Sequence, residues 1–348
     1  MDPNPEPASS GDENNNDVLE YRSFARIGFL GNPSDVYFGR TISFTIGNFW
    51  ASAKLEPSDH LLIKPHPFHD LVRFDSLDNL VCRLKNEGYY GGVRLLMAIC
   101  KVFRSYCKDN DIRLHDRNFT LSYDTNIPRQ TGLSGSSAIV SAALSCLLDY
   151  YNVFKTVLLK SMVVVLFTCK DHMDRVGYGI YTIMDINLLP PLHLIYAENP
   201  SDSGKLGSGF SETCLSTVRR KWLDGDEFII SSMAEIAKLA EEGRTALLNK
   251  DYTKLKELMN RNFDLRRIMF GDECLGAMNI EMVEVARKIG AAAKFTGSGG
   301  AMVAFCPDGP SQVKLLEEEC KKAGFIVEPV KLVPTRLNNS DLKTLSNP

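Results

Sequence analysis

A glycine- and serine-rich segment, Pro128 to Ala138, constrains this chain more than any other part of its sequence. It follows a short predicted strand, Phe119 to Tyr123. It leads directly into Ala138 to Tyr150, which is apolar nearly all round and is therefore predicted to be a buried helix. The order of strand, small-residue loop and buried helix is typical of a turn that presents backbone N–H groups at a helix N-terminus.

Such a loop is suited to binding phosphate. Small side chains let the backbone approach a polyphosphate, and successive N–H groups then bind the anion together with the positive helix end. Hydroxyl oxygens are ligands that Mg²⁺ accepts, so Ser136 and Ser137 are the expected metal ligands. The segment matches neither GxxxxGK[ST] nor a strand-GxGxxG turn. Alone, a short glycine-serine string is more often a flexible turn that caps a helix, but Pro128 and the apolar helix favour phosphate binding.

A second turn follows a strand near the start of the chain, over Ala25 to Asp35. Its polar residues are Asn32, Ser34 and Asp35, which a turn of this kind would direct toward a substrate. Alone, the segment is equally compatible with a structural Asx or proline turn.

A third glycine loop, Lys294 to Gly300, lies near the other end of the chain. Such a loop can shape one wall of a binding cleft, and alone it is equally compatible with a hairpin connection. The correct order and spacing of all three segments make a chance arrangement improbable.

The three segments resemble the three motifs of GHMP kinases, and Pro128 to Ala138 resembles the motif PxxxGLSSSA. This resemblance implies a two-domain α+β fold with the active site in the cleft between the domains, and it implies ATP and Mg²⁺. The expected substrate residues are Arg26, Asn32, Ser34 and Asp35. The expected ATP and phosphate residues are Pro128, Arg129, Gln130, Thr131, Gly132, Leu133, Ser134, Gly135, Ser136, Ser137, Ala138, Gly297, Ser298 and Gly299.

Within that superfamily, Gly31 to Gly39 and Tyr196 to Lys205 look like segments of plant-type glucuronokinases. The resemblance runs from about residue 21 to 333 and implies phosphorylation of the anomeric hydroxyl of D-glucuronate. The product would be the 1-phosphate that feeds UDP-glucuronate synthesis. A carboxylate substrate favours a guanidinium partner, and Arg26, Arg40 and Arg129 lie in or beside the motifs, although most arginines are structural.

The catalytic carboxylates of the family are missing from their usual place. In the family, the phosphate-loop helix is followed by a Glu that supports Mg²⁺. Next comes Gly-Leu-Gln-Asp-Arg-Val-Ala-Gln-Val-Tyr-Gly-Gly, whose Asp lies by the attacking hydroxyl. This chain instead has Phe154 to Cys169, and no acid occurs between Tyr150 and Lys170. Asp171, the first acid downstream, is the expected substitute base, although a surface Asp is usually solvated.

A frame slip is our hypothesis for the origin of the unusual segment. The family segment can be encoded so that translation from one base later gives Phe-Lys-Thr-Val-Leu-Leu-Lys-Ser-Met-Val, which is Phe154 to Val163. The hypothesis is a loss of upstream coding sequence with a frame slip that resets near Cys169, either as gene decay or as an error in the coding sequence. Val157 to Cys169 would then form a buried strand. The alternative function is a nucleotide-binding but catalytically inactive relative.

Composition fits a cytoplasmic globular enzyme. The 348 residues suffice for two domains, and 44% hydrophobic with 24% charged residues is ordinary. A net charge of −3 argues against nucleic-acid and polybasic membrane roles, which leaves a small sugar acid and ATP as expected partners. Nine cysteines without a CxxC pair argue against zinc and predict reduced thiols. The sequence does not indicate an oligomeric state.

We expect a disordered tail over residues 1–18, which are rich in Pro, Asn and acids. An N-terminal kinase domain over 19–210 would carry the substrate turn and the phosphate loop, and a C-terminal kinase domain would span 211–348. Periodicity further predicts paired strands in 41–62 and strands at 20–31, 192–196, 302–305 and 326–333. Helices are predicted at 89–106, 234–249, 252–269, 280–289 and 312–323.

Overall fold

The computed structural model describes residues 18–70, 74–87, 91–153, 163–167, 170–177, 179–197 and 212–333. The expected tail lies outside this part, apart from Val18. So do Glu198 to Lys205, which carry most of the second glucuronokinase-like string, and residues 154–162, 168 and 169 of the segment that replaces the family's catalytic region.

The first sheet is built around one long strand. β2 (Arg40–Pro57) pairs antiparallel with β1 (Leu19–Leu30) along most of its length. Its first residues also pair with β5 (Val163–Phe167) and its last with β4 (Phe119–Thr125). The prediction of paired strands across 41–62 was therefore wrong. A register shift opposite Phe24 and Ala25 lets the same strand change partners without a turn.

The remaining strands complete this sheet in the order β3-β4-β2-β5-β6, with β1 paired to β2. β3 spans Leu62–Ile63 and β6 spans Ile180–Ile183. The strand expected within Val157 to Cys169 is thus confirmed for Val163–Phe167.

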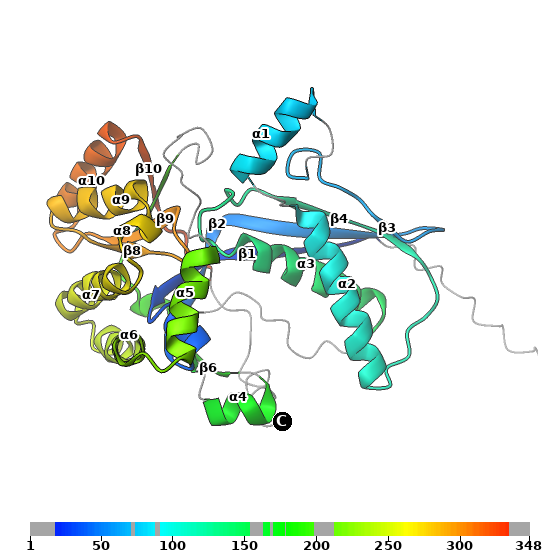
Figure 1. Ribbon diagram of the computed structural model, residues 1–348, viewed down its shortest axis with the longest axis horizontal. Helices are drawn as coiled ribbons and strands as arrows, with labels where there is room; N and C mark the ends of the chain where they lie inside the picture. The colour runs from blue at the N-terminus through cyan, green and yellow to red at the C-terminus, as the bar shows by residue number, and fades with distance from the viewer. Residues whose placement is uncertain are drawn as a thin grey trace, which may run out of the picture.

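Two helices pack on the first sheet (Figure 1). α2 (Gly92–Asp109) lies beside α3 (Gly135–Tyr150), and α3 contacts β1 and β2. α3 is apolar over most of its surface, and its alanines Ala142 and Ala143 are almost fully buried. The prediction of a buried helix is therefore confirmed, and it begins three residues earlier than expected.

The second sheet has the order β10-β7-β9-β8, and all its pairs are antiparallel. Its strands are β7 (Leu192–Ala197), β8 (Ala292–Phe295), β9 (Ala301–Phe305) and β10 (Phe325–Pro329). The division of the chain into domains at 210/211 stays a proposal. With this boundary, β7 belongs to the N-terminal domain by sequence but pairs with strands of the C-terminal domain.

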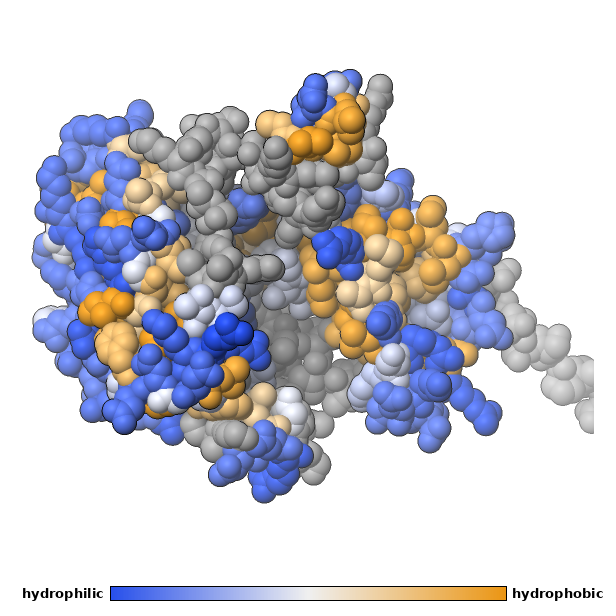
Figure 2. All heavy atoms as spheres, in the orientation of Figure 1, coloured by the Kyte–Doolittle hydropathy of each residue, from blue (hydrophilic) through white to orange (hydrophobic). Residues whose placement is uncertain are grey.

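Three helices of the second half pack on this sheet, on the left of Figure 1: α7 (Tyr252–Phe270), α9 (Ala277–Lys288) and α10 (Pro310–Lys322). α6 (Glu227–Leu248) packs on α7 and also contacts β1 and β2, α5 (Glu212–Leu223) contacts α6 and α7, and α8 (Asp272–Leu275) lies between α7 and α9 along the chain. Figure 2 shows a hollow in the surface between the two halves.

Periodicity predicted the long helices of the second half and missed the short or weakly amphipathic elements. The missed elements are α1 (Leu77–Glu87), α4 (Lys170–Val176), α5, α8, β6, β8 and the 3₁₀ turns η1 (Ser34–Tyr37) and η2 (Ile186–Leu188). Cys274 is disulfide-bonded, which corrects the expectation of reduced thiols throughout. No helix within the described ranges is both long and apolar enough to cross a membrane.

Candidate active site

The three glycine turns, far apart in sequence, meet at one place. The backbone N–H of Gly28 donates to the carbonyl of Thr296 at 2.7 Å, which joins the first turn to the third. The N–H of Arg26 donates to the carbonyl of Leu133 at 3.1 Å, which joins the first turn to the phosphate loop. The hydroxyl of Thr296 also lies 3.3 Å from the carbonyl of Gly132. The expected convergence of the turns is therefore present in the fold.

The contact between the phosphate loop and the third turn requires glycine. Gly132 has a φ of +62°, and a Cβ there would lie 2.7 Å from the carbonyl oxygen of Gly299. A Cβ on Gly297 would overlap the carbonyl oxygen of Gly132, and one on Gly300 would overlap that of Gln130. The two backbones thus touch directly, because no side chain stands between them.

The phosphate loop ends at the N-terminus of α3. Gln130, Gly132 and Ser134 all have left-handed φ values, at 59°, 62° and 61°. Ser134 is the N-cap residue but makes no capping hydrogen bond through its side chain. The first N–H groups of a helix have no partner within the helix, so those of Gly135 and the next residues suit an anion. Backbone strain of this kind is commonly retained where function needs it.

A cavity of about 270 Å³ opens on one side of the loop, and we call it the Tyr123 cavity. β4, the segment between β3 and α1 that carries His69, the first residue of α2, the phosphate loop and the start of α3 contribute to its lining. It is lined by His69, Gly92, Tyr123, Thr125, Ile127, Pro128, Arg129, Gln130, Thr131, Gly132, Leu133, Ser134, Gly135, Ser136, Ser137, Ile139 and Ser298. A flat apolar ring beside a phosphate site is a suitable occupant.

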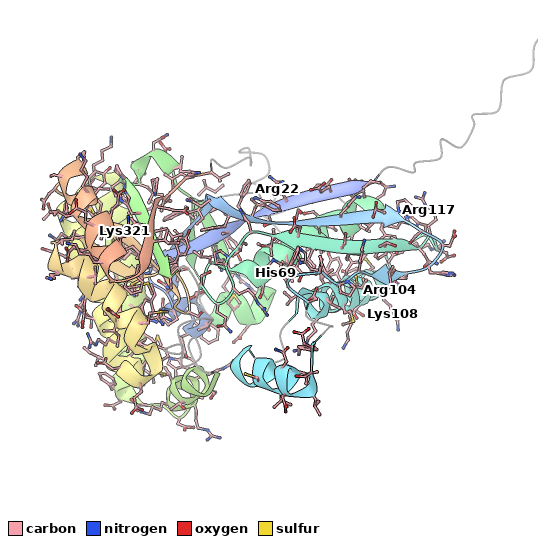
Figure 3. All side chains as sticks on the ribbon, turned by 90° about the horizontal axis from the view of Figure 1, so that it is seen from above. Arg22, His69, Arg104, Lys108, Arg117 and Lys321 are labelled. Atoms are coloured by element: carbon pink, nitrogen blue, oxygen red, sulfur yellow. The ribbon has the colours of Figure 1, made fainter. Side chains whose placement is uncertain are left out.

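His69 is held rigidly at the wall of this cavity, and Figure 3 shows it near the middle of the molecule. Its Nε2 lies 3.2 Å from the carbonyl of Thr125, and its ring lies 4.4 Å from that of His66. Burial, with the neighbouring His66, lowers the pKa of His69 below its ordinary value. His69 is therefore neutral at pH 7, and its imidazole adds a polar edge without charge.

A second cavity of about 400 Å³ borders the same loop, and we call it the Asp35 cavity. Residues of β1, the first turn, β2, α3, β6, α7 and the third turn line it. Its lining includes Arg26, Asn32, Asp35, Thr41, Ser43, Thr45, Ser141, Tyr181, Arg266 and Gly297. Ser134 and Ser137 of the phosphate loop and Ser298 of the third turn line both cavities, so the two cavities meet at these serines.

Asp35 is the carboxylate of this site. Among the described residues that line either cavity, no other Asp or Glu occurs. Burial raises the pKa of Asp35, and the positive charges of Arg26 and Arg266 oppose that rise. A half-buried carboxylate between two arginines can accept hydrogen bonds from a sugar hydroxyl and can accept its proton.

A buried lysine supports the first turn from below. Lys294 on β8 is 2% exposed, and its Nζ donates to the carbonyl of Gly28 and to Oδ1 of Asn32, both at 2.8 Å. Asn262 on α7 accepts from the N–H of Gly31 and donates to the carbonyl of Asn32. Since the oxygen of the Asn32 amide faces Lys294, its N–H₂ group is the part left for the cavity.

Arg266 on α7 forms the wall of the Asp35 cavity opposite the first turn. It is 4% exposed, and one of its terminal nitrogens donates to the carbonyl of Gly297 at 2.7 Å. Burial lowers the pKa of Arg266 to about 9, and Asp35 opposes this shift. No motif marks this residue, because it lies within a regular helix next to Arg267, an exposed arginine that pairs with Asp272.

The fold brings most of the expected residues together, but not all. Ser34 is buried, and its hydroxyl donates to the carbonyl of Arg40, so it supports the turn and does not line the cavity. Gly299 packs behind the loop against Asn279. Arg40 pairs with Glu241 on another surface. Asp171 is exposed on α4 and lines neither cavity.

Comparison with known proteins agrees with this arrangement. Residues 94–166 match the N-terminal domain of GHMP kinases, and residues 244–324 match the C-terminal domain. A solved galactokinase of Lactococcus lactis, complexed with galactose, has a TM-score of 0.63 at 15% identity. The match covers 90% of this chain and 93% of the galactokinase. The shared feature is therefore the fold.

Two curated proteins of Arabidopsis thaliana are far more similar in sequence. Probable glucuronokinase 2 is 76% identical over 374 residues, covering 99% of this chain and all of the relative. Glucuronokinase 1 is 68% identical over 372 residues, with the same shares covered. Since the chain has 348 residues, an alignment over 374 leaves at least 26 positions of the first relative without a counterpart here. With its two-sheet fold and its three converging turns, the chain belongs to the GHMP kinases and, among them, to the glucuronokinase family.

Proposed function

We propose that this chain is a sugar 1-kinase built to transfer the γ-phosphate of ATP to the anomeric hydroxyl of D-glucuronate. The product would be glucuronate 1-phosphate for UDP-glucuronate synthesis, and we expect the reaction in the cytoplasm. The observation that carries this proposal is the pair of cavities that meet at Ser134, Ser137 and Ser298. Phosphoryl transfer needs donor and acceptor on opposite sides of one positioned phosphate, which this arrangement supports.

The Tyr123 cavity is the proposed ATP site. The nucleobase would lie against Tyr123 and His69, and the phosphates would reach the N-terminus of α3. Pro128 to Ala138 would line the phosphates, with Gly297 and Ser298 on the opposite wall and Gly299 behind them. Arg129 lies on this side of the loop, where a guanidinium suits a phosphate.

The same loop fits a magnesium ion. The hydroxyls of Ser136 and Ser137 are the proposed protein ligands, since both residues line the Tyr123 cavity at the first turn of α3. When bound beside phosphate oxygens, Mg²⁺ neutralises charge that develops during transfer. No group of three His, Cys, Asp or Glu side chains that could hold a metal occurs in the described ranges, so nucleotide oxygens would complete the coordination shell.

The Asp35 cavity is the proposed sugar site. Arg26, Asn32 and Asp35 line it and would contact the sugar, and Ser34 would act indirectly by fixing the turn. Asp35 would accept hydrogen bonds from hydroxyls, and the N–H₂ group of Asn32 would donate one. We propose that this cavity lies between the two domains, with residues 19–210 on one side and residues 211–348 on the other.

The group that would accept the proton of the sugar hydroxyl is not clearly provided by this site. Asp171, the substitute base expected from sequence, remains a proposal that its exposed position does not support. Asp35 is the carboxylate that lines the cavity, yet its first task there is binding. The relative's at least 26 additional positions support the loss of the family's catalytic segment. This observation favours a second candidate function, that of a relative which binds nucleotide but does not phosphorylate a sugar.

An ATP-consumption assay with glucuronate, galacturonate, galactose and no sugar distinguishes the two functions. A kinase gives ADP formation that depends on glucuronate, whereas the second candidate gives none above the no-sugar control. Binding of Mg·ATP measured by calorimetry in the same preparation is expected for both. Absence of nucleotide binding would contradict both proposals.

A further inference from the structure

The charge of the Asp35 cavity is unusual for a site that takes a sugar. Arg26 and Arg266 are its cationic lining residues, and Asp35 is the single acid among the described ones. The side chain of Lys294 lies next to this lining, bound to Asn32, but burial lowers its pKa well below the ordinary value, so it is not counted among these charges. Among the described lining residues the two arginines outnumber the single acid, and a neutral sugar does not balance that difference.

Arg266 is held in place before any ligand arrives. Its guanidinium donates to the carbonyl of Gly297 at 2.7 Å, and its central carbon lies 5.0 Å from the ring centroid of Phe295. The ring of Phe270 lies 5.8 Å away on the same helix. A cation fixed by a carbonyl and two ring faces needs little reorganisation to bind an anion.

Burial also gives Arg266 a reason to prefer a charged partner. A desolvated guanidinium is less stable than one in water, and a carboxylate at the cavity wall would offset that cost. Asp35 contributes negative charge there, but its own pKa is raised by burial while Arg26 and Arg266 oppose that rise. Both arginines thus interact electrostatically with Asp35, and the carboxylate of a bound sugar would add a second negative charge beside them.

Other cations of the chain are poorly placed for this role. Arg129 lines the Tyr123 cavity across the loop, and Arg40 pairs with Glu241. Arg104 and Arg117 lie toward the far end of the first half, away from the helices of the second half (Figure 3).

We propose that Arg266, assisted by Arg26, binds the carboxylate of the sugar and so selects a uronic acid over a neutral hexose. This inference rests on the proposed function and adds to it the residue that sets substrate class. Arg266 comes from the second half of the chain, whereas the turn that carries Asn32 and Asp35 comes from the first. The bound substrate would therefore contact residues of both halves of the chain at the same time.

The test is binding without nucleotide, so that turnover does not enter. Calorimetry would compare D-glucuronate, D-glucuronamide and D-glucose on the wild-type chain, on Arg266→Gln and on Arg261→Gln. Arg261 is the matched control, an exposed arginine one and a half turns earlier on α7 that pairs with Glu235. Glutamine at 266 keeps an amide donor for Gly297 while removing the charge.

We expect the wild-type chain to bind glucuronate at least ~10-fold more tightly than the amide or glucose. Arg266→Gln should weaken glucuronate binding about 10- to 100-fold and leave the neutral ligands unchanged. Arg266→Lys should recover part of the preference, and Arg261→Gln should match the wild type.

Three results would overturn the proposal. One is equal affinity of the wild type for glucuronate and glucuronamide, which needs no variant and remains decisive if Arg266→Gln does not fold. Another is an equal loss of charged and neutral ligands in Arg266→Gln, which would mark a structural role only. The last is unchanged glucuronate affinity in that variant. Intact uronate binding without phosphoryl transfer would instead defeat the proposed function and leave this inference standing.

Discussion

Replacing Gly132 with alanine tests whether the phosphate loop and the third turn really share one surface. The new Cβ would lie 2.7 Å from the carbonyl oxygen of Gly299 and 2.8 Å from the backbone nitrogen of Ser298. Ordinary contacts begin near 3.4 Å, so the two backbones must separate by about 0.7 Å. Both are main chain, and no side chain can rotate out of the way.

The cost has two parts. Left-handed backbone costs an alanine about 1–2 kcal/mol relative to glycine. Overpacking between two fixed backbones adds about 1–3 kcal/mol. The separation would also stretch the hydrogen bond between Thr296 and Gly132. We therefore expect Gly132→Ala to lower the free energy of unfolding by about 2–5 kcal/mol, a large share of a typical total of about 5–15 kcal/mol.

Gly324→Ala is the control for this experiment. Its φ is +82°, and a Cβ there would meet nothing within 4 Å. It thus carries the left-handed strain without the clash, and should cost about 1–2 kcal/mol. Urea denaturation would measure both variants, and calorimetry would measure Mg·ATP affinity, which should fall for Gly132→Ala alone. Equal destabilisation with unchanged nucleotide affinity would refute the packing of the two loops and the location of the phosphate site.

Three further outcomes are expected. Replacing Phe154 to Cys169 with the family's catalytic segment should raise glucuronate phosphorylation about 10²–10⁴-fold in a turnover assay, and no gain would show that other parts of the site are defective. Asp171→Asn should change any residual turnover by less than about twofold, because the side chain is exposed. Asp35→Asn should abolish glucuronate binding measured by calorimetry, because Asp35 lines the sugar cavity. The opposite pattern would make Asp171 the base. Burial lowers the pKa of His193, so its contribution to stability is present above about pH 6.5 and is lost as the pH falls through the lower folded value. His193→Gln should therefore reduce the fall in the free energy of unfolding, measured with urea, as the pH drops below 6.5. His69, whose pKa is also lowered, would account for part of the remaining fall. The same dependence on pH in the variant and the wild type would contradict this assignment.

The sequence was informative where local backbone chemistry decides structure. The Gly-Ser loop before an apolar segment predicted a buried helix with a free N-terminus, because small residues and apolar periodicity act locally. Paired strands were predicted over 41–62 from the alternation of apolar and polar residues, which does not show where one strand ends. Gly47 and Asn48 lie inside β2, and such residues usually mark a turn. Here they lie where the strand changes partners at a bulge. A bulge and a turn have the same local signal.

Arg266 and Lys294 could not be found in this way. Arg266 lies next to exposed Arg267 on an amphipathic helix, and nothing in their neighbours distinguishes the buried one. Lys294 looked like the first residue of a loop, yet it lies within β8 and its Nζ is buried against Asn32 of the substrate turn. Burial of a charge depends on which distant segments pack around it, which a single sequence does not reveal. The shape of the turn itself misled us at Ser34, whose hydroxyl points inward.

The central claim is that this chain keeps the binding apparatus of a glucuronokinase while lacking its catalytic carboxylates. The most direct measurement is to titrate Mg·ATP and glucuronate by calorimetry and to record glucuronate-dependent ADP formation in the same preparation. The account predicts that both ligands bind, with turnover at least ~10²–10⁴-fold below that of an intact relative under identical conditions. Turnover equal to that of the relative would contradict the account.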